Sequence, residues 1–531
     1  MNVIDGQAGL VNYSSLIFYS LTINNILNIV VLLILASVTI STIFSDNGII
    51  KKAQEAANKT KEAVEQEQAE LNQLYNDLEN ALNSVPTPEP EPEEPANDGN
   101  YSETKGVNTP KLTAEMEPIK YDAENSRWVK ADKTSNDWYN YSAGEWANVV
   151  IGGQFDGSGV LNESADGYSM FVWIPRYAYN ITSGYHSNAA GTIDVVFLKG
   201  TSDEIGSSAE AAGKSIVSYS EASANGVSTH KFEEGKYVVH PAFVGDASLG
   251  GGYGNNSGAS DNGISGIWVA KFEASPEGAT TNVSNSQYNG TDKKLQVKPG
   301  VSSWRSITIS NIYDVCKAYN ETLNSHLMKN SEWGAVAYLS RSEYGRDDEV
   351  WINNSSSFIT GSAGNSPSEA TDTGTDTNYK SEQGVHASTT DNVYGIYDMS
   401  GGAWERVAAY VDNKNSSLTS YGNSLYTSTD AKTKNVYAAG SGDTRLANYN
   451  ANTSKYGDAI YETSRGTYNS SGDSDRQSWF DDYSGFPYSS YPFFRRGGYY
   501  GNGSDAGVFC FSYDNGSGYG YYSFRPVLVA N

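Results

Sequence analysis

The residues whose types are best suited to binding chemistry lie in one stretch near the end of the chain, Tyr499–Ser523. Of its 25 residues, 20 are Tyr, Gly, Ser, Asn or Asp. Tyr provides a large contact surface with a polar tip at low rotamer cost, and Ser, Gly and Asn provide adaptable hydrogen bonds. Plain low complexity is the alternative interpretation of such a composition. We interpret the stretch as a ligand-binding surface rather than as a catalytic centre.

Within the stretch, an apolar island around Val508 separates two polar parts, and we expect the island to be buried. Phe509, Phe511, Phe524 and Arg525 are expected to hold the scaffold. Cys510 is interpreted as a variable position that became Cys. The side chains predicted to contact ligand are those of Tyr500, Asn502, Asp505, Tyr513, Asp514, Asn515, Ser517, Tyr519, Tyr521 and Tyr522.

Motifs for catalysis are absent from the sequence. It has five histidines, and it contains no HExxH, no GxSxG and no phosphate-binding loop. The two cysteines, Cys316 and Cys510, form neither a CxxC motif nor a Cys/His metal spacing. Cys316 is expected to be a small buried apolar residue. We therefore predict a protein that is not an enzyme and requires no cofactor.

The charge of the chain excludes one class of partner. The formal net charge is -26 over 531 residues, so nucleic acid backbones and anionic lipid head groups would be repelled. A nucleic acid partner is therefore not expected. The length allows one large domain or two ordinary ones with tethering segments.

The elements that would position the binding surface begin with an N-terminal tether. In the N-terminal segment, residues 1–45, we predict a transmembrane helix at about 22–44, because residues 6–45 contain no charged residue. In residues 46–84, apolar residues recur every seven positions, which predicts an amphipathic helical stalk. Residues 85–99 form a Pro/Glu linker, which is expected to be extended.

The remainder, residues 100–531, is predicted to be a single α+β head domain. Apolar runs at 168–181, 193–200, 235–243 and 266–275 indicate strands. The segments Ser310–Asn320 and Ser331–Leu339 indicate helices. The long polar insertions are expected to be surface loops, and they lie at about 245–262, 353–390 and 411–478.

Five motifs in order along the head carry a family resemblance. They are GIWVAKFEAS, SSWRSI before DVCKAYN, MKNSEWGAVAYL, NVYGIYDMSGGAWERVAAYV, and FFRRGGYYGNGSDAG followed by SFRPVL. In this order they resemble the C-type-lectin fold of the formylglycine-generating-enzyme (sulfatase-modifying factor) type. The resemblance implies a C-type-lectin-like head. The enzymes of that type carry a redox-active cysteine pair late in the chain, where this sequence has Cys510 alone, so an oxidase activity is not expected.

The same resemblance implies a structural calcium site. In this sequence its ligands would be backbone carbonyls and the Glu side chain of Ser400, Gly401, Ala403 and Glu405. Such oxygen ligands suit calcium. Local capping or pairing by Glu405 is the alternative.

The composition of Tyr499–Ser523 matches what mutagenesis directed at adenines would produce. Asn, Tyr, Ser, Asp, Gly and Cys codons all follow from an Asn codon by changes at its two adenines. The stretch therefore resembles the product of a diversity-generating retroelement, whose variable proteins place the variable repeat at the extreme C-terminus of such a head. This resemblance implies a variable region at about 499–523 that binds an external protein or glycan.

The run VVLLILASVTISTIFSDNGIIKKAQEA resembles the N-terminal helix of pilin-like proteins. It implies a helix that lies in the membrane or packs with other pilin-like subunits. We therefore expect an adhesin or receptor, anchored in the membrane at the cell surface with its head outside. The alternatives are a structural or minor pilin subunit without a diversified site and, third, an oxidase of the formylglycine-generating type.

Overall fold

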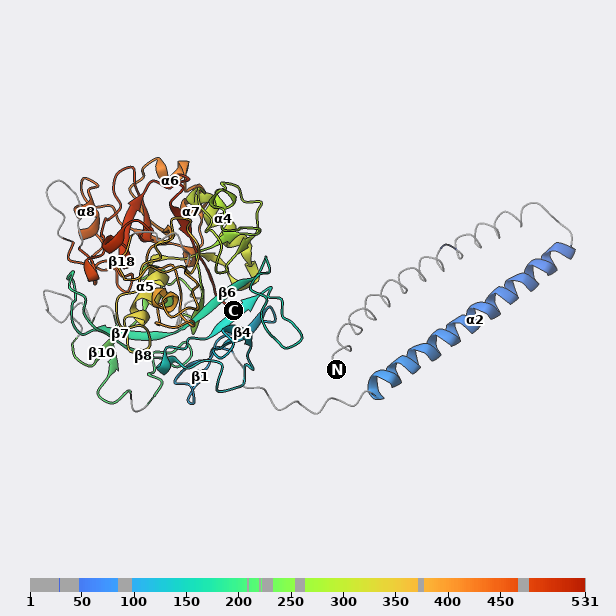
Figure 1. Ribbon diagram of the computed structural model, residues 1–531. Helices are drawn as coiled ribbons and strands as arrows, with labels where there is room; N and C mark the ends of the chain where they lie inside the picture. The colour runs from blue at the N-terminus through green and yellow to red at the C-terminus, as the bar shows by residue number, and fades with distance from the viewer. Residues whose placement is uncertain are drawn as a thin grey trace. The chain divides into compact units, whose positions relative to one another are not determined.

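The computed structural model describes residues 28, 47–84, 98–207, 210–218, 221, 233–253, 263–370, 377–466 and 477–530, with side chains of the helix at 47–84 described for 58–76. The contacts divide the chain into two units, Met1–Glu93 and Glu94–Asn531. Figure 1 shows the elements of each unit, and the two units are described separately below.

The first unit contains helix α2, Asn47–Ser84, which is 38 residues long. Its described side chains are almost all exposed, and those of Val64 and Leu74 are 56% and 67% exposed. Lys61 and Glu65 form an exposed ion pair one turn apart, at 3.8 Å. The helix is therefore predominantly polar, with an apolar stripe narrower than its charged surface.

The predicted fold class needs a correction at the N-terminus. Within the residues described here, no helix is long and apolar enough to cross a membrane. The expected fold, with a head behind a long transmembrane or pilin-like helix, is therefore wrong for this part of the chain, where the long helix α2 is charged along its length. Apart from Asn28, the predicted span at about 22–44 lies outside the described residues. The described chain is instead a mixed, sheet-rich fold.

The largest sheet of the second unit has seven strands, and all its pairings are antiparallel. Strand β6 lies inside the sheet, between two neighbours, and is buried along its whole length. In order across the sheet the strands are β14 (His326–Leu327), β20 (Pro526–Leu528), β11 (Gly266–Ala270), β6 (Ser169–Pro175), β5 (Asn148–Ile151), β3 (Met116–Asp122) and β4 (Arg127–Lys130).

A second sheet is built around strand β15, which pairs antiparallel with β17 and parallel with β16 and β19. Strand β18, drawn in red in Figure 1, pairs antiparallel with β17. The strands are β16 (Asn435–Tyr437), β15 (Trp404–Val411), β17 (Phe493–Gly497), β18 (Gly507–Asp514) and β19 (Tyr522–Phe524). The C-terminal stretch Tyr499–Ser523 therefore supplies β18 and most of β19.

The smaller sheets lie elsewhere in the second unit. A four-stranded sheet has the order β8 (Ile193–Phe197), β7 (Tyr177–Ile181), β10 (Lys236–Val239) and β9 (Ser215–Ile216). Two short pairs join β1 (Tyr101–Ser102) to β2 (Val107–Asn108) and β12 (Ser275–Pro276) to β13 (Leu295–Gln296). The four apolar runs predicted to be strands all contain one, and the first is divided into β6 and β7 at Arg176.

The helices of the second unit are short. They are α4 (Ile309–Tyr319), α5 (Asn330–Ser340), α6 (Ser417–Ser420), α7 (Asn423–Thr427) and α8 (Arg445–Asn450). Short 3-10 helices are η1 (Tyr141–Ala143), η2 (Pro241–Phe243), η3 (Val283–Ser286), η4 (Glu321–Leu323), η5 (Gly384–Ala387), η6 (Ala431–Thr433), η7 (Trp479–Asp481) and η8 (Gly503–Asp505). The two predicted helices are confirmed as α4 and α5. Helix α5 starts one residue before the predicted Ser331, and Glu332 accepts a hydrogen bond from the Lys329 backbone at 2.9 Å.

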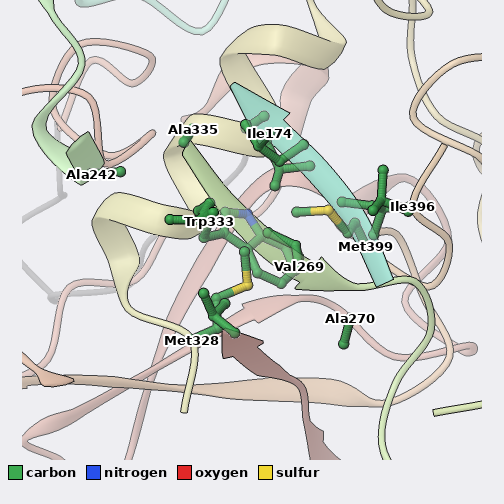
Figure 2. Close-up of a cluster of buried hydrophobic side chains, with 14 of the residues drawn as sticks. Ile174, Ala242, Val269, Ala270, Met328, Trp333, Ala335, Ile396 and Met399 are labelled. Carbon is green, nitrogen blue, oxygen red and sulfur yellow. The ribbon is translucent and has the colours of Figure 1, made fainter. Parts of the chain in front are cut away.

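Helix α5 lies in the core of the second unit, and all of its residues are buried. Figure 2 shows part of this core, where Trp333 and Ala335 come from α5, Ile174 from β6 and Val269 from β11. The indole nitrogen of Trp333 donates a hydrogen bond to the carbonyl oxygen of Val508 in β18, at 2.8 Å. The core therefore holds β18 directly, through its backbone.

The insertion at 353–390 differs from the expected surface loop, because 352–355 and 358–364 are buried. The Asn353 amide donates to Asp398 Oδ1 at 2.8 Å and to the Ile359 carbonyl oxygen at 2.9 Å. The backbone N–H of Gly361 donates to the same Asp398 oxygen at 2.8 Å. Polar residues can be buried here because their hydrogen bonds are satisfied within the segment and against Asp398.

Buried ionisable groups predict how the stability of the protein depends on pH. Burial raises the pKa of Glu462 and Glu349 to about 7 and raises that of Asp482. Burial lowers the pKa of His240 to about 3, and this shift changes the pH dependence of stability in the opposite direction. Between pH 4.5 and 7 each of the three carboxyl groups binds more protons in the folded state than in the unfolded state. His240 binds fewer protons in the folded state, but it is one group against three. The free energy of unfolding is therefore expected to fall as the pH rises through this window.

This dependence can be measured from urea unfolding midpoints between pH 5 and pH 8. The midpoint is expected to be higher near pH 5.5 than near pH 7.5. A Glu462→Gln variant should show a shallower pH dependence, because one of the contributing groups no longer titrates. A midpoint that rises with pH in the wild-type protein would contradict the assignment.

Candidate ligand-binding site

One face of the second sheet carries the residues of the candidate site. Trp404 of β15 lies opposite Tyr522 of β19, and Arg495 of β17 lies opposite Arg406 of β15 and Ser512 of β18. Because successive side chains of a strand point to opposite faces, Trp404 and Arg406 share a face, and Glu405 points to the other. The other face is buried, with Glu405 and Arg496 at 1% and 0% exposure.

A hollow of about 440 Å³ opens over this face. From the C-terminal stretch it is lined by Tyr499, Asn502, Asp505, Tyr519, Tyr521 and Tyr522. Trp404, Tyr483 and Arg495 complete the lining. Six of these nine residues are aromatic, so the walls offer flat apolar surfaces with polar edges. Its volume is in the range of small-molecule and side-chain pockets.

The tyrosines of the hollow pack on one another. The ring of Tyr521 lies 5.3 Å from that of Tyr499 and 5.5 Å from that of Tyr519. Tyr519 also lies 4.9 Å from Tyr522. Tyr519 and Tyr521 are nevertheless 50% and 39% exposed, among the most exposed large hydrophobic side chains described in this unit. They present ring surface to the solvent that a ligand could cover.

The positive charge of the lining comes from Arg495. Its guanidinium lies 4.3 Å from the ring centre of Trp404 and 4.7 Å from that of Tyr522. It donates hydrogen bonds to the Tyr522 hydroxyl and, at 3.3 Å, to the Ser512 hydroxyl. The Arg495 side chain is thereby held in place by contacts on several sides.

Of the ten residues predicted to contact ligand, five line the hollow: Asn502, Asp505, Tyr519, Tyr521 and Tyr522. Tyr500 is partly buried, with its ring 5.1 Å from that of Phe358 and 5.1 Å from that of Tyr499. It therefore supports the wall of the hollow from behind.

The other four predicted contacts do not line the hollow. The Tyr513 hydroxyl accepts a hydrogen bond from Arg445 at 2.7 Å, and its ring packs on Tyr488. Asp514 is 4% exposed and forms an ion pair with Arg406 at 2.7 Å. Asn515 Oδ1 accepts hydrogen bonds from the backbone and the side chain of Ser517. These interactions shape the turn between β18 and β19.

The predicted scaffold residues are buried as expected. Phe509, Phe511, Phe524 and Arg525 are between 0% and 3% exposed. Cys510 is fully buried, and burial raises the pKa of its thiol. Cys316 is also buried, which confirms its prediction as a small buried residue.

Of the residues implied for calcium, Glu405 is paired with a different cation, the guanidinium of Arg525. Both carboxylate oxygens of Glu405 accept hydrogen bonds from the guanidinium of Arg525, one of them at 2.7 Å. The Ser400 carbonyl oxygen accepts from the Asn353 backbone at 2.7 Å, and the Ala403 N–H donates to Glu273 at 2.8 Å. Gly401 donates its N–H to the Gly497 carbonyl oxygen. Glu405 thus pairs with Arg525, so its carboxylate is already occupied in this arrangement. Across the described ranges, no group of three or more His, Cys, Asp or Glu residues could hold a metal ion.

A second hollow, of about 260 Å³, borders a buried polar cluster at Tyr253 and His326. His326 Nε2 lies 2.9 Å from Glu332 Oε1, and the Tyr253 hydroxyl donates to the same oxygen at 2.6 Å. Burial disfavours the charge of Glu332, but the charges of His326 and Lys329 outweigh this effect and lower its pKa to about 2. Glu332 therefore stays charged and is hydrogen-bonded to His326 and Tyr253. We interpret this buried cluster as structural and not as a binding site.

Sequence reasoning missed four residues that line the main hollow. Tyr499 lies inside the analysed stretch and could have been chosen by its type. Trp404 and Arg495 could have been found from strand alternation, since each is next to a residue, Glu405 or Arg496, that points into the core. Tyr483 carries no signal in the sequence, because it follows the 3-10 helix η7 and reaches the site through tertiary packing.

Comparison with known proteins gives no family for this chain. No protein-family model matches it, and no curated protein is similar to it in sequence.

Proposed function

We propose that this protein is a ligand-binding protein of the adhesin or receptor kind, and not an enzyme, with a diversified binding site on a C-type-lectin fold of the formylglycine-generating-enzyme type. The observation that carries the proposal is the position of the main hollow. Six of its nine lining residues come from Tyr499–Ser523, the stretch whose composition resembles diversified sequence. The ligand would be an external protein or glycan, so the proposal places the head outside the cell.

The burial pattern of the stretch supports diversification. Its exposed tyrosines, Tyr519 and Tyr521, belong to the set of residues reached from an Asn codon. Phe509 and Phe511, which do not belong to that set, are buried. The exposed members of the set can therefore vary without disturbing the core, as in variable binding loops on a rigid scaffold, whereas buried members such as Cys510 and Asp514 are constrained by their packing.

An oxidase of the formylglycine-generating type is less well supported. Thiol chemistry requires a reactive thiolate. Cys510 is fully buried, and burial raises the pKa of its thiol, so it remains protonated. The sequence has one other cysteine, Cys316, which is also buried.

The proposal is tested by deep sequencing of the 3′ end of the gene in a population of the source cells. We expect substitutions confined to adenine-derived codons of Tyr499–Ser523, most often at Tyr499, Asn502, Asp505, Tyr519 and Tyr521, with a near-identical template repeat nearby. Codons for Trp404 and Arg495 should be uniform in the same reads. A uniform stretch without a template copy would reject diversification and leave a surface domain with one invariant site.

A further inference from the structure

The guanidinium of Arg495 has hydrogen-bonding capacity that the protein does not use. An Arg side chain has five N–H donors. In Arg495, Nη1 and Nη2 donate to the hydroxyls of Tyr522 and Ser512, and the buried Nε has no hydrogen-bond partner. Both partners are neutral hydroxyl groups.

Two other arginines, Arg406 of β15 and Arg525 directly after β19, have carboxylate partners. Arg406 forms an ion pair with Asp514 at 2.7 Å, and Arg525 forms one with Glu405. For Arg495, the described part of the chain contains no carboxylate within ion-pair distance. Arg496 of β17 likewise has no ion pair within the described residues, but it is fully buried, so Arg495 is the arginine of this strand that lines the hollow.

Arg495 is also held in a defined orientation. Its guanidinium lies over both the Trp404 and the Tyr522 ring, at 4.3 Å and 4.7 Å from the ring centres. Stacking of this kind fixes the plane of the guanidinium, and the N–H groups of Nη1 and Nη2 that Tyr522 and Ser512 do not use remain for a planar partner. Little conformational entropy remains to be lost when an anion binds to it.

We propose that the hollow recognises a carboxylate group of its ligand, with Arg495 as the anchor. This inference rests on the proposed function, because it concerns the ligand of the same site. A planar carboxylate matches the guanidinium edge, and one negative charge matches one positive charge. A phosphate dianion would carry a second charge beside Asp505, which also lines the hollow. The exposed rings of Tyr519 and Tyr521 would cover the uncharged remainder of the ligand.

The anchor lies outside the stretch that is proposed to vary. Arg495 and Trp404 precede Tyr499, whereas Asp505 and the exposed tyrosines lie within the stretch. Every variant would therefore keep the guanidinium, and variation would change the walls around it. The chemical class of the ligand stays the same, while the molecule that carries the carboxylate changes.

The test compares pairs of acidic and neutral probes on the full-length chain by isothermal titration calorimetry. One pair is trigalacturonic acid and its methyl ester, and the other is an acetylated, amidated Gly-Glu-Gly peptide and its Gln counterpart. In at least one pair, the acid should bind at least tenfold more tightly than its neutral partner. The pair that shows this difference identifies the source of the carboxylate, a sugar acid or an acidic peptide.

Two variants with opposite expected effects make the test specific. Arg495→Gln should remove the preference for the acid, and Asp505→Asn should increase the affinity for it severalfold, because a like charge is removed. Thermal melting of both variants checks that they fold. If Arg495→Gln does not fold, two other variants test the anchor. Arg495→Lys keeps the charge but loses the bidentate geometry, so it should weaken the preference for the acid. Asp505→Asn should still increase the affinity for the acid.

Equal binding of acid and neutral probes, or no binding of any acid, would overturn the inference. So would an acid preference that persists in Arg495→Gln or is reduced in Asp505→Asn, and so would inorganic phosphate binding as tightly as the acids. Failure here is distinguishable from failure of the proposed function. If the 3′ end of the gene varies in the population but the protein shows no preference for the acid, the protein remains a diversified binder without this anchor.

Discussion

Replacing Tyr519 and Tyr521 together with Ala is expected to abolish ligand capture while the stability of the head stays nearly unchanged. The two rings are 50% and 39% exposed, so their removal leaves little of the core uncovered. In a binding site, truncation of a central aromatic residue typically costs about 2 kcal/mol or more. Loss of both should therefore weaken binding by about 100-fold or more, whereas surface substitutions usually change stability by about 0.5 kcal/mol or less.

The measurement is biolayer interferometry with ligands that the wild-type protein recovers from a glycan array and a peptide library, alongside urea unfolding. Tyr421→Ala is a matched control, because Tyr421 is 36% exposed and does not line the main hollow. It should bind ligand as the wild-type protein does. Tyr522 is left in place, since it is partly buried and accepts a hydrogen bond from Arg495. A fall of more than about 2 kcal/mol in unfolding free energy would instead mark the two rings as part of the core.

Arg525→Met is expected to lower the free energy of unfolding by about 3 kcal/mol or more. The guanidinium donates to Glu405 and also to the backbone carbonyl oxygens of Ala270 and Tyr397, at 3.0 Å and 2.9 Å. Without it, Glu405, whose pKa burial already raises to about 7, would be left at 1% exposure beside the carboxyl group of Asp398 and would have to take up a proton to stay buried. Removing one partner of a buried ion pair typically costs about 3–5 kcal/mol.

A double variant separates the cost of an unpaired charge from the value of the pair. Glu405→Leu combined with Arg525→Met removes both charges, and it should recover part of the lost stability, because no uncompensated carboxylate remains. Urea unfolding of the wild-type protein and the single and double variants completes the cycle. An Arg525→Met protein as stable as the wild type would show that Glu405 is protonated or solvated in the folded state.

The sequence was informative where neighbouring residues determine the structure. The apolar runs that form β6, β7 and β11 predicted strands because β-branched and aromatic residues dominate them. The apolar character of Phe509 and Phe511 predicted their burial within a polar stretch. These features depend on a few consecutive residues, so one sequence is sufficient to predict them.

It was less informative where distant residues meet. Asp514 was predicted to contact ligand because it lies in a polar, Tyr-rich turn, but its partner Arg406 is 108 residues away in sequence. The strand register that places Trp404 opposite Tyr522 likewise depends on a long-range pairing, and these two residues form part of the hollow's lining. The insertion containing Asn353 was predicted to be a surface loop because its composition is polar. Its burial depends on Asp398, which lies outside the insertion. Such pairings cannot be derived from local pattern alone.

The parallel pairing of β19 with β15 places Tyr522 and Ser523 on opposite faces of one sheet, the first lining the hollow and the second fully buried. Insertion of a single residue within this strand, between Tyr522 and Ser523, would reverse the face on which the following residues point. A change of length inside β19 would therefore disturb both the lining of the hollow and the core, whereas a substitution of Tyr522 changes the lining without moving Ser523 out of the core.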